Sequence, residues 1–163
     1  MSMIIDGTNG LTFNNATTQA SAGVVLQVVN ATYATFTGTA STTLVATGIT
    51  ASITPKFSTS KILVITNMNG IYSTSAGVTN WCHSELFKNG STLNAISDVN
   101  AYNTGISVNS PFTYFDSPAT TSATTYAVYY KNGGAGGATI YFNNYAGTAS
   151  NTVSTITLME IAQ

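Results

Sequence analysis

The sequence has very little charge. It contains no arginine, and its four lysines and five acidic residues make only 6% of the 163 residues charged, with a formal net charge of −1. An ordinary soluble domain has about 25% charged residues. Binding to nucleic acid or to an anionic membrane needs clustered cations, and the four lysines lie far apart in the chain, at positions 56, 61, 88 and 131. We therefore expect neither partner.

Cysteine and long apolar runs are also scarce. Cys82 is the only cysteine, which excludes an intrachain disulfide, so packing alone must hold the fold together. The first residues lack the basic region of a secretory signal, and no segment approaches the ~18 apolar residues of a membrane helix. We expect synthesis and assembly in the cytoplasm, whether or not the protein later acts outside the cell.

Neutral polar residues take the place of charge: the chain has 29 Thr, 17 Ser and 16 Asn. Nine Tyr, seven Phe and many Val and Ile residues supply the apolar area that a disordered chain lacks. Thr, Val, Ile, Tyr and Phe favour strands, whereas the 14 Gly and the Asn residues favour tight turns. The composition predicts one all-β domain with a short appendage.

Apolar runs separated by turn residues predict about eight to ten short strands and no helix. Asn89-Gly90 is typical of a two-residue hairpin turn. Without a repeat of fixed period, this pattern favours an antiparallel jelly-roll β-sandwich over residues 23–163. The strands are expected at 24–29, 31–36, 42–53, 61–66, 81–88, 91–96, 113–115, 125–131, 139–143 and 153–161.

Residues 1–22 differ from the rest of the chain. Gly and Asn residues surround two small apolar groups, Ile4-Ile5 and Leu11 with Phe13. The segment is too short and too interrupted to form a core of its own. We predict an N-terminal arm that docks on another protein through these four side chains; a frayed terminus is the alternative.

Several strands have apolar residues on both faces. In residues 61–66, Leu63 and Ile65 point to one side while Ile62 and Val64 point to the other. A two-sheet sandwich has one interior, and no helix is predicted to cover the second face. We predict that further copies of the chain cover it. The subunit interface is assigned to the residues that alternate with Cys82 on the next strand, Trp81, His83, Glu85 and Phe87; the alternative is ordinary exposure of apolar side chains.

The reactive side chains do not form a convincing catalytic set. Cys82 and His83 are neighbours on a strand and must point to opposite faces, which excludes a Cys-His pair. His83 and Glu85 share a face but are too few to bind zinc, so a hydrogen bond at an interface is expected. Glu85 and Asp98 remain as a hydrolase alternative, since glycosidases use two carboxylates. We predict no enzyme activity, no metal site and no cofactor.

Two tyrosines in polar loops are candidates for glycan contact. Tyr102 lies in Asn100-Ala101-Tyr102-Asn103, and Tyr145 follows Asn143-Asn144. Aromatic faces stack on the C–H surface of sugars, and Asn supplies hydrogen bonds. The alternative is that both are ordinary loop tyrosines.

Short motifs in the chain resemble those of bacteriophage virion proteins. Gly10-Leu11-Thr12-Phe13 followed by Thr17-Thr18-Gln19 is similar to a segment found near the N-termini or domain junctions of tail fibres. The hairpin Glu85–Gly90 resembles the trimeric jelly rolls of the C1q and tumour-necrosis-factor type. The body resembles small phage structural proteins at residues 26–29, 51–55, 60–64, 116–126 and 158–162.

The resemblance implies a non-enzymatic, homotrimeric structural protein of the virion, exposed on the particle surface. It would dock on other virion proteins through residues 1–22 and would stabilise the particle or contact a glycan on the host surface. The chain lacks the shaft repeats of a long fibre, which leaves a short tail fibre, a spike or a capsid decoration. A free lectin-like module and, less favoured, a polysaccharide-degrading enzyme are the alternatives.

Overall fold

The structure is a computed structural model that describes residues 4–6, 10–12, 18–19, 24–74, 80–101, 106–134, 137–145 and 151–163. For residues 4–6, 10–12, 18–19, 95 and 96 it describes the backbone alone. The described residues form strands and turns, so the expected all-β class is confirmed.

Within the described residues, thirteen strands form three antiparallel sheets. The arm contributes a small sheet of β1 (Ile4–Asp6), β2 (Gly10–Thr12) and β3 (Thr18–Gln19). The body begins with β4 (Val25–Tyr33), β5 (Thr37–Thr39), β6 (Val45–Ile53) and β7 (Lys61–Ser73). It continues with β8 (Trp81–Lys88), β9 (Ser91–Asn100), β10 (Val108–Asp116), β11 (Thr124–Asn132), β12 (Ile140–Phe142) and β13 (Ser154–Ile161).

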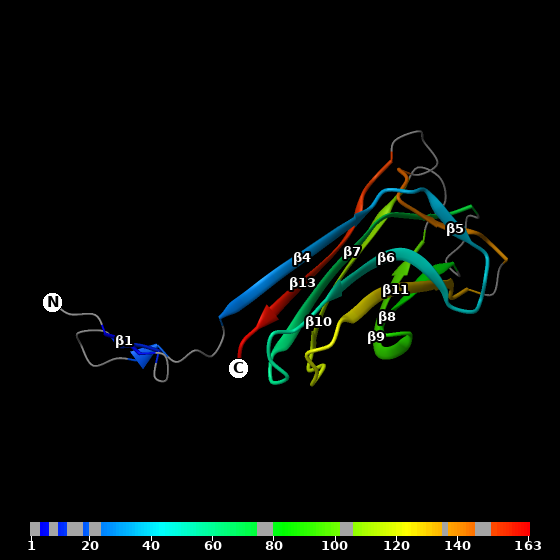
Figure 1. Cartoon of the computed structure of the whole chain (residues 1–163). Coiled ribbons are helices and arrows are strands. Elements are labelled where there is room, and N and C mark those ends of the chain that lie inside the picture. The colour runs from blue at the N-terminus through cyan, green and yellow to red at the C-terminus, as the bar shows by residue number, and fades with distance from the viewer. Residues whose placement is uncertain are drawn as a thin grey trace.

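Eight of these strands make a jelly roll (Figure 1). One sheet has the order β4-β13-β7-β10, and the other has the order β6-β11-β8-β9. Strands early in the body therefore pair with strands late in it, as if one long hairpin had been rolled into two layers. Two short strands extend the first sheet at the end of β7: β12 pairs with Tyr72 and Ser73 of β7, and β5 pairs with β12.

The core lies between the two sheets and follows the expected alternation. In β7, Ile62 and Val64 are fully buried, and Ile156 and Leu158 of β13 lie beside them. From the opposite sheet, Tyr126 and Tyr130 of β11 are also fully buried. Burying large apolar side chains stabilises a fold by roughly 1.5–3 kcal/mol each, which makes this layer the main source of stability.

Strand boundaries depart from the sequence prediction where polar residues occupy strands. Residues 24–36, expected as two runs, contain one continuous strand, β4. Strand β10 starts five residues before its predicted start and includes Pro111. Proline lacks an N–H donor and is tolerated on edge strands, and β7 is the one described strand that pairs with β10. The Asn89-Gly90 turn is as predicted, since both residues have the positive φ angles, 49° and 83°, of a type I′ turn.

Two carboxylates are buried in ways that the sequence does not indicate. Asp116, the last residue of β10, is buried, lies 2.9 Å from the Lys88 ammonium, and accepts a hydrogen bond from the Tyr126 hydroxyl. Glu160 is fully buried and accepts hydrogen bonds from the Gln27 amide (2.6 Å) and the Lys56 backbone N–H (2.7 Å). Burial alone would raise the pKa of Glu160, but these hydrogen bonds lower it below its ordinary value.

The two ends of the sandwich differ. The connections at one end are short: residues 54–60, the turn at 89–90, and residues 117–123. The arm joins the body at this end, and the C-terminus lies there too (Figure 1). The two long connections that contain β5 and β12 lie at the opposite end, where Asn143 donates hydrogen bonds to the carbonyls of Tyr33 and Thr35. We call these the arm end and the loop end.

Candidate interaction surfaces

The predicted interface residues lie together on the outer face of the β6-β11-β8-β9 sheet. Cys82 is fully buried in the core, whereas His83 and Glu85 are partly exposed on the other side of β8. Cys82 and His83 therefore point in opposite directions, as expected. Trp81 and Phe87 are also partly exposed and occupy the same outward positions. We call the set Trp81, His83, Glu85 and Phe87 the β8 face.

His83 is held between two carboxylates. Its Nε2 is 2.9 Å from Glu85 Oε1, and its Nδ1 is 2.6 Å from Asp98 Oδ1 on the neighbouring strand. An ionised carboxylate only accepts hydrogen bonds, so each of the two contacts needs an N–H on the ring nitrogen that faces it. The expected His83–Glu85 hydrogen bond is present, and it is made within one chain.

The same cluster brings together the two carboxylates considered for hydrolysis. The imidazole of His83 occupies the space between Glu85 and Asp98, where a glycosidase would place the sugar. Glu85 also accepts a hydrogen bond from the Thr92 hydroxyl at 2.8 Å. The hydrogen bond from His83 lowers the pKa of Glu85 against the opposing effect of burial, and Thr92 and the charges of His83 and Lys131 lower it further.

Aromatic contacts complete the β8 face. Phe87 stacks on Tyr129 with ring centroids 4.1 Å apart. Trp81 packs so closely over Gly133 that an added Cβ would overlap the indole ring. Each of the four side chains of the β8 face thus already contacts another residue of the same chain.

The outer face of the other sheet is more apolar and more exposed. Strand pairing aligns one residue from each of four strands, Val28, Met159, Leu63 and Phe115, in a row across the sheet. We call this the outer apolar row. Val28 is 55% exposed and Phe115 is 47% exposed, and Ile65 in the next row is 39% exposed. The sequence prediction noted Leu63 and Ile65 but missed the row, because it depends on the register of four strands that are distant in the chain.

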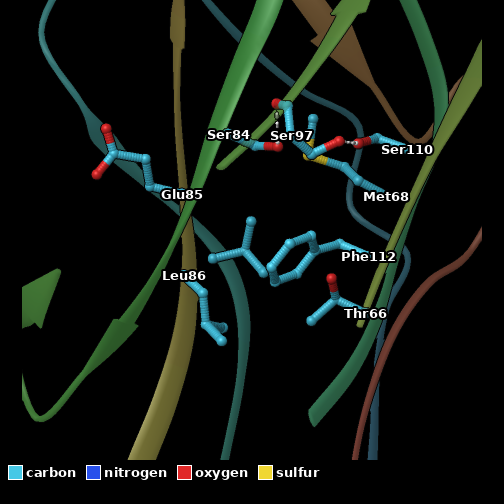
Figure 2. Close-up of a pocket in the computed structure, with 9 residues that line it drawn as sticks. Thr66, Met68, Ser84, Glu85, Leu86, Ser97, Ser110 and Phe112 are labelled. Atoms are coloured by element: carbon cyan, nitrogen blue, oxygen red, sulfur yellow. Dashed lines mark hydrogen bonds between the residues drawn. The ribbon is translucent and has the colours of Figure 1, made fainter. Parts of the chain in front are cut away.

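A cavity of about 360 Å³ lies at the arm end and is lined by Val24, Leu26, Phe57, Thr59, Ala162 and Gln163. Its rim residues Val24 and Phe57 are exposed. A second cavity lies between the sheets near Ser97 and Ser110, whose hydroxyls are 2.7 Å apart (Figure 2). At about 10 Å³ it has the size of a single water, and the Glu85 carboxylate points away from it (Figure 2).

Aromatic residues are also exposed at the loop end. Tyr145 is 54% exposed in the connection after β12. Phe36 is 45% exposed and stacks on Tyr141, which stacks in turn on Tyr72. The other predicted glycan contact, Tyr102, lies outside the described residues.

The arm residues stay a prediction. Ile4, Ile5 and Leu11 belong to β1 and β2, in which Ile5 pairs with Leu11, and the structure describes only their backbone. Phe13 lies outside the described residues. Strands β1 to β3 pair with one another and form a sheet separate from those of the body.

The body is therefore a jelly-roll β-sandwich whose two outer faces carry different side chains and whose two ends differ in their connections. Within the described residues, no group of three or more His, Cys, Asp or Glu side chains is arranged to hold a metal ion. No helix in the described part of the chain has the length and apolarity needed to cross a membrane. Comparisons with models of known protein families and with curated proteins find no match to this chain.

Proposed function

We propose that the protein is a non-enzymatic structural protein of a bacteriophage virion, either a short fibre or spike or a capsid decoration. In this proposal, residues 1–22 attach a homotrimeric β head to other virion proteins. The head stabilises the particle or contacts the host surface. The short motifs near residues 10–19 and along the body supply the connection to phage proteins.

The observation that carries the proposal is the difference between the two ends of the head. The arm and the C-terminus occupy one end, and the two long connections that contain β5 and β12 occupy the other (Figure 1). A molecule attached at the arm end presents its loop end outward. Loops on a rigid scaffold are the usual location of binding residues. Several copies on one particle would raise avidity without any new contact.

Immunoelectron microscopy tests this proposal. An antibody raised against the purified protein should decorate intact virions recovered from the source culture, at regular positions on the head or the tail. Decoration of disrupted particles only, or of no particles, would contradict the proposal. Light scattering after gel filtration should give about three times the 16.9 kDa mass of one chain.

A lectin-like function is a second candidate, favoured by the exposure of Tyr145 at the loop end. The test is binding of the purified protein to bacterial surface polysaccharide. Tyr145→Ala should reduce binding at least tenfold, because the stacking of an aromatic face on the C–H surface of a sugar is lost. Phe57→Ala is the matched control, since Phe57 is equally exposed, at 55%, but lies at the arm end. Equal binding by both variants and the wild type would exclude a role for Tyr145.

A further inference from the structure

We infer that the outer apolar row and its surroundings are the surface on which copies of this chain pack against one another. This inference rests on the proposed homo-oligomer and names the face that the oligomer buries. The β8 face is the rival prediction. The two faces belong to different sheets, so experiments can separate them.

Exposure distinguishes the two faces. The described residues include ten large apolar side chains that are exposed. Six of them lie on the outer face of the β4-β13-β7-β10 sheet or at its arm end, namely Val24, Val25, Val28, Phe57, Ile65 and Phe115. The other four are at the loop end, so none of the ten is on the outer face of the β6-β11-β8-β9 sheet. Clustered exposure of this kind marks an interaction site.

The size of the apolar surface fits the centre of a subunit interface. Four strands at ~4.8 Å spacing and about six residues at ~3.4 Å each give a projected area of roughly 400 Å². This area covers the outer apolar row at its centre and one neighbouring row on each side, in which Ile161 and Ile65 lie beside polar residues. A standard interface covers about 800 Å² per partner, with an apolar centre and a polar rim. Towards the loop end the same face becomes polar, with Asn30, Thr157 and Thr113 beside Ile65, and then Thr32, Thr155 and Asn67.

Charge favours a second copy of the chain as the occupant. Among the outward-facing residues of these four strands, Lys61 is the only charged one, and its ammonium lies over the Phe115 ring, 5.3 Å from the centroid. Like surfaces with so little charge meet without strong repulsion. A basic partner would find no complementary charge among these residues, and an acidic partner would find Lys61 alone. The β8 face instead carries Glu85 and His83 beside Asp98, which are already paired with one another.

The experiment measures the oligomer mass of full-length variants by light scattering at micromolar concentration. Val28→Lys and Ile65→Lys each place a charge at an exposed position of the proposed surface, and we expect the mass to fall to that of a monomer. Ala46→Lys is the matched control, an exposed position on the other sheet whose strand partner is Tyr129. It should keep the wild-type mass. Circular dichroism spectra that match the wild type establish that each variant is folded.

Thiol labelling gives a second measurement that does not require dissociation. The native Cys82 is fully buried, and burial, together with the Asp98 charge, raises the pKa of its thiol to about 12, so it reacts slowly. A cysteine introduced by Ile65→Cys should react with maleimide at least tenfold more slowly than one introduced by Ala46→Cys in the assembled protein. Under dissociating conditions the two rates should converge.

The possible results distinguish a failure of this inference from a failure of the proposed homo-oligomer. A monomeric wild-type protein would overturn the proposed homo-oligomer, and with it the inference. A wild-type oligomer that survives Val28→Lys and Ile65→Lys but dissociates with Ala46→Lys would overturn the inference alone and assign the interface to the β8 face. Fast labelling of Ile65→Cys in an intact oligomer would also overturn it, because the surface would then be open to solvent.

Discussion

His83 lies between Glu85 and Asp98, and this arrangement makes the stability of the outer face depend on pH. The pKa of Glu85 is below its ordinary value of 4.5. A group with a lowered pKa in the folded state stabilises the fold at pH values above its ordinary pKa. That contribution is lost as the pH falls through the ordinary value towards the folded-state pKa. Substituting Glu85 therefore tests whether its charge makes the stability depend on pH.

We predict that Glu85→Gln lowers the free energy of unfolding by about 1–2 kcal/mol at pH 7, because a charged hydrogen bond becomes a neutral one. The difference from the wild type should shrink as the pH falls through the ordinary pKa of Glu85, because protonation removes the charge that the substitution removes. Urea denaturation at several pH values measures it. Thr92→Val is the control, since it removes a hydrogen bond to Glu85 and leaves the charge in place. A constant difference for Glu85→Gln down to pH 3 would contradict the role given to the charge.

The sequence predicts only part of this residue-level picture. Alternation on β8 is enough to place His83 and Glu85 on one face and Cys82 in the core. The position of Asp98 is not predictable in this way, because it depends on a register shift between Leu86 and Phe87 in the pairing with β9. The burial of Asp116 is not predictable for a similar reason: its partners Lys88 and Tyr126 come from strands that only the folded sheets bring close.

At the scale of single elements, β7 illustrates why strand boundaries were harder to predict than strand existence. Its first six residues are β-branched or apolar apart from Lys61 and were predicted as a strand. The strand continues to Ser73 through Asn67 and Gly70, residues that favour turns. Gly70 has a φ of +64° and lies near the register shift in the pairing with β10. Long-range pairing thus overrides local preference at this point.

We predict a large difference between two alanine substitutions at glycines with positive φ. Gly90→Ala should cost about 1 kcal/mol, since the turn is open and only the backbone conformation is strained. Gly70→Ala should cost about 2–4 kcal/mol, because its Cβ would also collide with the Asn144 backbone and the Thr152 hydroxyl, each 2.5 Å away. Thermal and urea denaturation measure both. Equal costs would show that the packing around Gly70 relaxes freely.

At the scale of the whole molecule, composition and periodicity are sufficient to predict the all-β class, and they place apolar side chains on both faces of β7. They were not sufficient to say which face is most apolar. The outer apolar row takes one residue from each of four strands, and Val28 and Phe115 are 87 positions apart in the sequence. Their alignment follows from the jelly-roll order, in which the first strand of the body pairs with the last.

The same order predicts how the body responds to loss of the arm. Strand β4 pairs along its length with β13, and the core residues that the structure describes all belong to the body. Strands β1 to β3 pair only among themselves within the described residues. Removing residues 1–22 should therefore leave a folded protein whose Tm differs from that of the full chain by less than about 3 °C, equivalent to roughly 1 kcal/mol. Its oligomer mass should stay that of three truncated chains.

The truncated protein should, however, fail to attach to particles, which separates docking from folding. The readout is addition of the labelled full-length and truncated proteins to virions that lack the protein, followed by sedimentation of the particles. Only the full-length protein should sediment with them, because the truncated chain lacks Ile4, Ile5, Leu11 and Phe13. Loss of folding on truncation would make the arm part of the domain. Equal attachment of the two proteins would move the docking surface to the body, where the apolar cavity beside Phe57 at the arm end is the next candidate.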